Sequence, residues 1–336
     1  MIKHWIRGAL TVAALVGAGS AMAETKLLFS TFFPQTHPII SKVMVPWMKD
    51  VEAATQGRVK IEMASASLAP PPGQMDMVQK GIADVALQYT GVVPKRLQPE
   101  LLTELPGTTG TSAAMSRALW ETHQKYFAKD NRYKGTELLS LFVFPTQHFF
   151  CLNECFTTID QFRSAKIATT PGTAARQYGA LTSGIVAGPA VRYFEVVSKG
   201  IVDGYGAITA PDIYSFNLAP STKGMLELKE LGTAGSFALL MNEGKWKSLS
   251  AADREAISKL SGAAFTARLA EMDKADEEAL KKMAAGGIKI SEANPALLAD
   301  LRKAYAFLED EWVKEAGTRG IDGKAALQFY RSQLRK

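Results

Sequence analysis

TKLLFSTF, residues 25–32, opens a repeating pattern of short apolar segments and helical segments. This apolar stretch predicts a buried strand, and residues 39–51 then carry apolar side chains three and four positions apart, as an amphipathic helix does. Residues 58–63 (RVKIEM) alternate as a second strand. A second helical segment, 73–82, leads to a third strand at 85–89 (VALQY). The order strand, helix, strand, helix, strand is typical of a doubly wound α/β sheet.

The same order returns after residue 145. Residues 166–169 (KIAT) predict a strand, and Pro171 opens a helical pattern that continues to about Leu181. A further helix is expected over 192–200, followed by a turn at 201–204 into another strand. Two such units predict an α/β protein with two lobes.

The last third of the chain is helical in pattern. Residues 250–284 are alanine-rich and amphipathic, and apart from Gly262 nothing interrupts the pattern. A coiled coil is an alternative, but strict heptads are absent, so we expect one long helix that spans both lobes. Two more helices are expected at 296–316 and 323–334. The predicted lobe boundaries are 24–144 with 233–272 for the N-terminal lobe and 145–232 with 273–336 for the C-terminal lobe.

The first 23 residues have the three parts of a secretory signal peptide. Lys3 and Arg7 give a positive start, residues 9–19 form an apolar run, and Ala21-Met22-Ala23 offers a cleavage site before Glu24. The run is shorter than the roughly 20 residues that cross a bilayer. An N-terminal anchor helix is the alternative. No cysteine follows the run to carry a lipid, and we expect a free, exported protein in the periplasm.

The charge of the chain excludes several functions. The 39 Lys and Arg include Lys3 and Arg7, so 37 remain after cleavage against 33 Asp and Glu, a formal net charge of +4. No block of five or six like charges occurs, and we expect no nucleic-acid partner. Three histidines remain, without Gly-x-Ser-x-Gly or metal-ligand spacing. We therefore expect no enzyme, no metal and no cofactor, and keep an exported hydrolase as the alternative function.

The chain has two cysteines, Cys151 and Cys155, with three residues between them. An oxidising compartment favours a disulfide between them. A contribution to a metal site is the alternative, but only His148 lies close by and no second pair exists. A redox role has no supporting motif.

Several motifs, in their order and spacing, resemble the periplasmic solute receptors of tripartite ATP-independent (TRAP) transporters, of the dicarboxylate-receptor (DctP) type. The similarity runs over nearly the whole chain after the signal peptide. The matching segments are Phe33-Pro34-Gln35-Thr36-His37-Pro38, Gly57-Arg58-Val59-Lys60-Ile61-Glu62, Gly81-Ile82-Ala83-Asp84, Gly200-Ile201-Val202-Asp203-Gly204, Met241-Asn242 with Trp246 and Leu249-Ser250, and Trp312 with Gly323-Lys324-Ala325.

The resemblance implies the two-lobed fold of periplasmic binding proteins, and it also implies a function. Members bind one small organic acid in a cleft between two lobes and close around it. The loaded receptor then docks on a membrane permease that is driven by an ion gradient. A receptor that feeds a sensor kinase rather than a permease would have the same sequence features.

The chain departs from the family at the positions that hold the ligand. Where the family has Lys-hydrophobic-Arg, with the arginine on the ligand carboxylate, this chain has Lys166-Ile167-Ala168. A second arginine falls on Gln147, and an asparagine falls near Ala207. An alanine side chain can neither donate a hydrogen bond nor carry charge, so we expect a ligand other than a standard dicarboxylate.

Other residues can replace the lost contacts. Backbone N–H groups near Thr170, at the start of a helix, can bind an anion, and aromatic side chains stand at the expected cleft edges. These features suit an aromatic acid, a neutral polar solute, or a small cation over ring faces. His37 either contacts the solute or serves the entry to the first helix. The candidate ligand-binding residues are Phe33, His37, Tyr89, Phe144, Gln147, Ala168, Thr169, Thr170, Tyr193, Tyr205 and Ala207.

Overall fold

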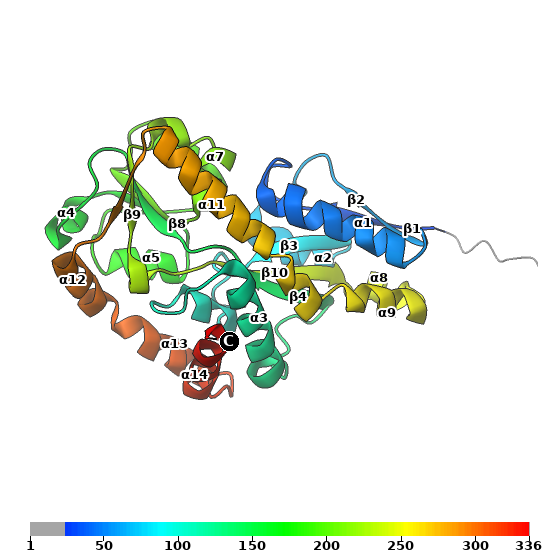
Figure 1. Ribbon diagram of the computed structural model, residues 1–336. Helices are drawn as coiled ribbons and strands as arrows, with labels where there is room; N and C mark the ends of the chain where they lie inside the picture. The colour runs from blue at the N-terminus through cyan, green and yellow to red at the C-terminus, as the bar shows by residue number, and fades with distance from the viewer. Residues whose placement is uncertain (1–23, 336) are drawn as a thin grey trace, which may run out of the picture.

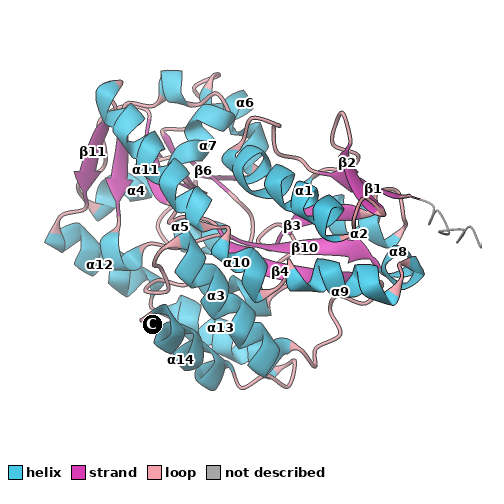
Figure 2. Ribbon diagram, turned by 45° about the vertical axis from the view of Figure 1, so that its right-hand side comes forward, coloured by secondary structure: helices cyan, strands magenta, loops and turns pink. Residues whose placement is uncertain are grey.

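The computed structural model describes residues 24–335, and the predicted signal peptide, 1–23, lies outside them. The strands form two separate sheets, which lie side by side with helices packed around both (Figures 1 and 2). The predicted α/β class is therefore confirmed. Within the described residues, no helix is both long and apolar enough to span a membrane.

The first sheet has five strands in the order β2-β1-β3-β10-β4. Strands β1, β2 and β3 are parallel, whereas β10 runs antiparallel to both β3 and β4. The first three strands are confirmed close to their predicted bounds; β4 and β10 were not predicted. The bounds are β1 Thr25–Ser30, β2 Val59–Met63, β3 Val85–Tyr89, β4 Thr136–Val143 and β10 Ser236–Asn242.

The predicted helix over 39–51 forms in two parts. A π-helical segment, η1, is followed by α1, and Pro46 lies in the first turn of α1. Proline has no N–H to donate and is tolerated in a first turn, so Pro46 sets this division. The helical elements up to residue 127 are η1 Ile39–Met44, α1 Val45–Ala54, η2 Pro71–Gly73, α2 Gln74–Gln79, η3 Pro99–Glu104, α3 Ser112–Thr122 and η4 His123–Phe127.

The second sheet has six strands in the order β11-β9-β5-β8-β6-β7, with β5 antiparallel to both β8 and β9. The predicted strand at 166–169 is β6, and the strand after the 201–204 turn is β8. The strand bounds are β5 His148–Cys151, β6 Ile167–Thr169, β7 Ile185–Ala187, β8 Gly204–Ile208, β9 Gly224–Glu227 and β11 Lys289–Glu292. The helical elements are α4 Ile159–Ser164, α5 Thr173–Gly179, η5 Ala190–Arg192, α6 Tyr193–Val197, α7 Ala210–Ser215, η6 Ala219–Ser221 and η7 Lys229–Leu231.

The unbroken helix predicted over 250–284 is wrong. Gly262 has a positive φ of 54°, and its N–H donates to the carbonyl of Leu139 on β4 instead of continuing a helix. Contacts with a distant strand therefore end the first segment. The segments from residue 243 onward are α8 Glu243–Ser248, α9 Ala251–Lys259, α10 Ala263–Ala267 and α11 Ala270–Ala285.

Helix α11 contacts elements of both lobes. It contacts η1 and α3 beside the first sheet and α7 and β11 beside the second, and it crosses the junction between the two groups of strands (Figure 1). The prediction of a helix that spans both lobes holds for this segment.

The C-terminal chain returns from the second sheet to the first. The predicted helix 296–316 divides at Ala306 into α12 Pro295–Tyr305 and α13 Phe307–Gly317, and α14 Gly323–Leu334 follows almost as predicted. Helix α12 contacts α4 and η7, whereas α13 contacts η3 and α14 contacts α3. The residue boundaries of the two lobes stay a prediction.

An aromatic core connects helices α1 and α10 with strands β4 and β10 of the first sheet. Trp47 of α1 meets Phe265 of α10 edge to face at 6.0 Å between ring centroids. Phe265 lies 5.4 Å from Phe142, which stacks on Phe237 at 5.5 Å. The ring contacts therefore extend the core to the end of β4 and the beginning of β10.

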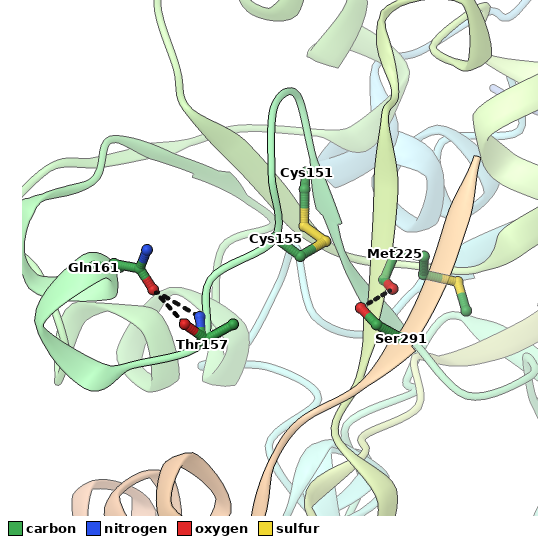
Figure 3. Close-up of a disulfide and its surroundings, with 6 residues drawn as sticks. All are labelled: Cys151, Cys155, Thr157, Gln161, Met225 and Ser291. Atoms are coloured by element: carbon green, nitrogen blue, oxygen red, sulfur yellow. Dashed lines mark hydrogen bonds between the residues drawn. A yellow bond between two sulfur atoms is a disulfide. The ribbon is translucent and has the colours of Figure 1, made fainter. Parts of the chain in front are cut away.

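The predicted disulfide is present. Cys151 ends β5 and is bonded to Cys155, with their Cα atoms 5.2 Å apart (Figure 3). The sulfur of Cys155 packs on Gly224 of β9, where an added Cβ would lie only 2.7 Å away. Beyond the loop, the N–H of Thr157 donates to Gln161 Oε1 over 2.7 Å (Figure 3). The bond thus fixes the turn that leaves β5.

Replacing both cysteines with alanine (C151A/C155A) is expected to lower the free energy of unfolding by about 2 kcal/mol, because the small closed loop constrains the unfolded chain only modestly. Urea denaturation of the oxidised wild type and the double variant measures the difference. Reduced wild type is the control, because it lacks the bond but keeps both cysteine side chains, and it therefore separates loss of the bond from loss of packing. Equal stability of oxidised wild type and double variant would contradict the prediction.

Candidate functional site

A cavity lies where strands of the two sheets end toward each other. It encloses about 480 Å³ of empty space, a volume that includes its opening to solvent. The residues that line it from the first sheet and its loops are Phe32, Phe33, Pro71, Tyr89, Val92, Phe144, Gly235 and Phe237. From the second they are Gln147, Thr170, Pro189, Ala190, Val191, Ala207, Ile208, Thr209, Asp212 and Phe216.

Four phenylalanines form one side of the cavity, here called the aromatic wall: Phe33, Phe144, Phe216 and Phe237. Phe144 and Phe237 stack with their centroids 4.2 Å apart, and Phe33 lies 5.6 Å from Phe144 and 5.7 Å from Phe237. Phe216 stacks on Phe33 at 6.4 Å. These spacings are typical of favourable ring pairs, so the wall presents preformed ring surface to a ligand.

Tyr89, Gln147 and Thr170 line the same cavity and form the polar patch. The hydroxyls of Tyr89 and Thr170 lie 3.3 Å apart. The amide nitrogen of Gln147 donates to the carbonyl of Ala207 over 3.0 Å. Burial raises the pKa of Tyr89 well above its usual value, and the neighbouring Thr170 and Gln147 side chains lower it by less. The patch therefore consists of neutral hydroxyl and amide groups, of which the Tyr89 hydroxyl donates to Glu104 Oε1 over 2.8 Å.

Among the described residues, no lysine, arginine or histidine lines the cavity, and Asp212 is its charged group. Asp212 lies on α7, where its Oδ2 accepts from the N–H and the hydroxyl of Thr209, both over 2.7 Å, as a capping box does. Its Oδ1 accepts from His37 Nε2 over 3.0 Å. The carboxylate is thus already held on the wall by its own helix and by the other lobe.

His37 lies behind the aromatic wall, fully buried. Its Nδ1 accepts from the N–H of Ile39 over 3.1 Å, which leaves the Nε2 hydrogen to donate to Asp212. The ring stacks on Phe144 and Phe216. The structure therefore places His37 at the helix entry and as a bridge between the lobes, in a layer behind the lining residues.

Six of the sequence-predicted site residues line the cavity: Phe33, Tyr89, Phe144, Gln147, Thr170 and Ala207. The remaining five, His37, Ala168, Thr169, Tyr193 and Tyr205, are buried but do not line it. Ala168 pairs with Val186 and Tyr205 within the second sheet. The hydroxyl of Tyr193 donates to the carbonyl of Gly206 over 3.1 Å, and that of Tyr205 meets Thr222 Oγ1 at 2.5 Å.

Several lining residues were missed from the sequence. Thr209-x-x-Asp212 directly after a predicted strand is a capping-box signal that could have indicated a helix start at the site. Phe237 lies on β10, a strand that was not predicted, and Phe216 directly follows the end of α7. No local signal marks these two phenylalanines as cavity residues, since their position depends on packing between segments far apart in the sequence.

Ala207 has an unusual backbone conformation, with a positive φ of 61° at an irregularity in the pairing of β5 with β8. A left-handed conformation costs an L-residue without glycine's freedom roughly 1–2 kcal/mol, and asparagine tolerates it better than most residues. The family resemblance implies an asparagine near this position, a residue that would adopt this backbone conformation more readily than alanine does.

The two lobes touch beside the polar patch. Gly172 precedes α5 with a φ of 82°, and a Cβ built on it would lie 2.6 Å from the carbonyl oxygen of Gly91, which follows β3. Only a residue without a side chain allows this approach. The two lobes are therefore in direct contact next to Tyr89.

Comparison with known proteins identifies the class. The model of the bacterial extracellular solute-binding protein family 7 (DctP) matches residues 29–315, and the chain belongs to this family. A relative from Comamonas testosteroni, described as outer membrane transporter protein TsaT, is 33% identical over 325 residues, which cover 97% of this chain and 96% of the relative.

Solved structures of TRAP solute-binding proteins share the fold. One from Bordetella bronchiseptica, with bound (R)- and (S)-mandelate, superposes with a TM-score of 0.88 at 28% identity over 93% of this chain and 99% of its own. A marine metagenome protein specific for aromatic acids, with 3-hydroxybenzoate, gives a TM-score of 0.85 at 25% identity over 93% and 98%. The predicted TRAP receptor family and the two-lobed fold are confirmed.

Proposed function

We propose that this protein is a periplasmic receptor that binds a one-ring aromatic acid, as its anion, between the two lobes and delivers it to a TRAP-type permease. One observation carries the proposal: a single cavity holds both the aromatic wall and the polar patch. A ring stacked on the wall would direct its carboxylate toward Tyr89, Gln147 and Thr170. Ring pairs of this kind contribute about 0.5–1.5 kcal/mol beyond the buried area.

The charges of the lining residues argue against a dicarboxylate. A buried anion needs a partner, and an uncompensated one costs several kcal/mol. One carboxylate can be met by the neutral donors of the polar patch. A second carboxylate would meet either the apolar wall or the carboxylate of Asp212, and neither can neutralise it.

The ligands of the relatives support this choice. The Bordetella protein binds mandelate and the metagenome protein 3-hydroxybenzoate, and both ligands combine one ring with one carboxylate. These two parts of the ligands correspond to the aromatic wall and the polar patch that line the cavity of this chain.

A small organic cation is the second candidate. Asp212 stands on the wall beside Phe216 and Phe33, and aromatic faces with a nearby carboxylate attract quaternary ammonium groups. Both oxygens of Asp212 are already engaged by Thr209 and His37, which weakens the case. The same ligand panel distinguishes the two candidates.

The test is thermal denaturation with (R)-mandelate, (S)-mandelate, benzoate and 3-hydroxybenzoate, against succinate, malate and choline, followed by calorimetry. The aromatic acids are expected to raise the melting temperature, and the dicarboxylates and choline to leave it unchanged. A shift with succinate or choline alone would overturn the proposal. Turnover of ester or amide substrates in a general hydrolase panel would favour the hydrolase alternative. A gene for a sensor kinase rather than for a permease beside the gene of this protein would favour sensing.

Thr170→Val tests where the carboxylate lies. The change removes one hydroxyl and keeps the shape, so the affinity for the aromatic acid is expected to fall by about 1 kcal/mol, roughly fivefold. Thr169→Val is the matched control, because Thr169 is equally buried and does not line the cavity. Equal affinities of the two variants would place the carboxylate elsewhere.

A further inference from the structure

Behind the polar patch lies a carboxyl group that does not itself line the cavity. Glu104 ends η3 and is 1% exposed. The hydroxyl of Tyr89 donates to its Oε1 over 2.8 Å, and the same hydroxyl lies 3.3 Å from Thr170 Oγ1. Glu104, Tyr89 and Thr170 thus form a chain of polar groups from one lobe to the other along the cavity wall.

The surroundings of Glu104 depend on the contact between the lobes. A Cβ on Gly91 would lie 2.7 Å from Glu104 Oε1, and Gly91 is itself packed against Gly172 of the opposite lobe. Helix α5, which begins at Thr173, contacts η3. Separation of the lobes would take Gly172 and Thr173 away from the carboxyl and admit water to it.

Among residues 24–335, no cationic side chain compensates this carboxyl. On the elements packed around Glu104, the charged groups already have partners: Glu100 of η3 pairs with Arg132, and Arg176 of α5 pairs with Glu311 and Glu315 of α13. The nearby tyrosines are neutral, because burial raises the pKa values of Tyr89, Tyr178 and Tyr193. Glu104 Oε2 has no hydrogen-bond partner among the described residues. Burial raises the pKa of Glu104 to about 7, while Tyr89 and the nearby Thr173 lower it by less.

We propose that Glu104 is a positioning residue that takes up a proton from solvent when the lobes close on the aromatic acid, so that the Tyr89 hydroxyl turns to donate to the ligand carboxylate. This inference rests on the proposed function. The receptor would thus capture an anion together with a proton, which compensates for a cavity without a cationic side chain.

The hydrogen atoms of the chain explain the coupling. Tyr89 has one hydroxyl hydrogen. When Glu104 is ionised, its Oε1 accepts that hydrogen, and Tyr89 presents only lone pairs to the cavity. When Glu104 is protonated, its own O–H can donate to the Tyr89 oxygen, and the Tyr89 hydrogen is released toward Thr170 and the cavity. A ligand carboxylate then gains one donor.

The direction of the pH dependence follows from linkage. The pKa of Glu104 is raised in the closed protein and returns toward about 4.3 once water reaches the group, so the closed state binds more protons. Affinity should therefore be highest at low pH and fall as pH rises, by roughly 10- to 50-fold between pH 5 and pH 7 and by no more than about threefold from pH 7 to pH 8. Mandelate is a suitable probe because its own carboxyl ionises well below this range.

The experiment measures the dissociation constant of (R)-mandelate from pH 5 to pH 8 by calorimetry, in wild type, Glu104→Gln and Asp276→Asn. Glutamine is neutral at every pH and keeps the size of the side chain, so E104Q should bind with little pH dependence and more tightly than wild type at pH 8. Asp276 of α11 is the matched control, because burial also raises its pKa to about 7 but it does not touch the cavity wall; D276N should keep the wild-type profile.

Infrared titration with and without (R)-mandelate, in the D276N background so that Asp276 adds no band, decides the inference separately. With the ligand bound, a protonated carboxyl band that disappears near pH 7 and is missing from the E104Q variant is expected, and without the ligand this band should shift toward about pH 4.3. If aromatic acids fail to bind at any pH, the proposed function fails, and the position of this band in the ligand-free protein alone tests Glu104. A flat affinity profile in wild type, a profile unchanged by E104Q, or no such band would overturn the inference.

Discussion

Replacing Arg132 with methionine is expected to lower the free energy of unfolding by about 3–5 kcal/mol, because it leaves a buried carboxylate without its cation. Arg132 and Glu100 have side chains that are 1% and 0% exposed. Arg132 Nε donates to Glu100 Oε1 over 2.8 Å, and Nη1 donates to the carbonyl of Phe127 over 2.8 Å. Glu100 retains only the hydroxyl of Tyr133, at 2.9 Å, when the guanidinium is removed.

The neighbouring His123 cannot replace the lost charge. Burial lowers the pKa of His123 to about 3, with Arg132 as the second cause, so the ring is neutral at ordinary pH. Its Nδ1 lies 3.0 Å from Arg132 Nη2 and accepts a hydrogen bond from it. The variant therefore loses several bonds as well as the charge.

Urea denaturation followed by circular dichroism measures the effect, and two controls interpret it. Arg163→Met breaks an exposed pair with Asp160, whose side chains are 63% and 80% exposed, and should change stability by less than about 0.5 kcal/mol. The double variant R132M/E100M replaces both charges with apolar groups and should recover at least half of the loss. A loss as small as that of R163M would contradict the prediction.

Replacing Gly172 with alanine is expected to weaken ligand binding by about 10- to 100-fold, because the new Cβ would collide with the carbonyl of Gly91 only when the lobes are closed. The position also has a φ of 82°, which strains any residue other than glycine. Gly200 is the matched control: its φ is 63°, and nothing lies within 4 Å of an added Cβ.

Comparison of G172A with G200A therefore separates the collision from the backbone strain. G200A should lose about 1 kcal/mol of unfolding free energy, and G172A should lose more, because Gly172 combines its φ of 82° with a ψ of −139°, a conformation that is strained for any residue but glycine. Calorimetry with the aromatic acid should show weak binding in G172A alone, and small-angle scattering should show it more extended than wild type with ligand. Equal affinities in the two variants would mean that the contact between Gly91 and Gly172 does not limit closure.

Part of the candidate site could be predicted from the sequence because the ends of the strands can be located from the apolar segments. Tyr89, Gln147 and Thr170 lie at or just beyond apolar segments that pattern reasoning or the family resemblance located, and ligands in open α/β sheets lie beyond the carboxyl ends of strands. The same reasoning chose Tyr205, which instead points into the second sheet's own core against Phe150, at 5.2 Å between ring centroids. Alternation along a strand leaves the choice of face open.

The sequence by itself determined the α/β class, the bounds of β3 and α14, the disulfide between Cys151 and Cys155, and the family. Local sequence patterns indicate these features: alternation in strands, helical periodicity, and two cysteines close enough in the sequence to pair. Each is set by residues within a few turns or strands of one another.

Only the tertiary structure decided which side chains form the cavity. Phe237 reaches the wall because β10 inserts antiparallel between β3 and β4, and Gly262 ends a helix because it bonds to Leu139. Ala168, where the resemblance implies an arginine in other members, is paired between β7 and β8 and does not line the cavity. The physical reason is that these positions depend on contacts between segments more than 60 residues apart or on the packing of neighbouring strands, which no local pattern records.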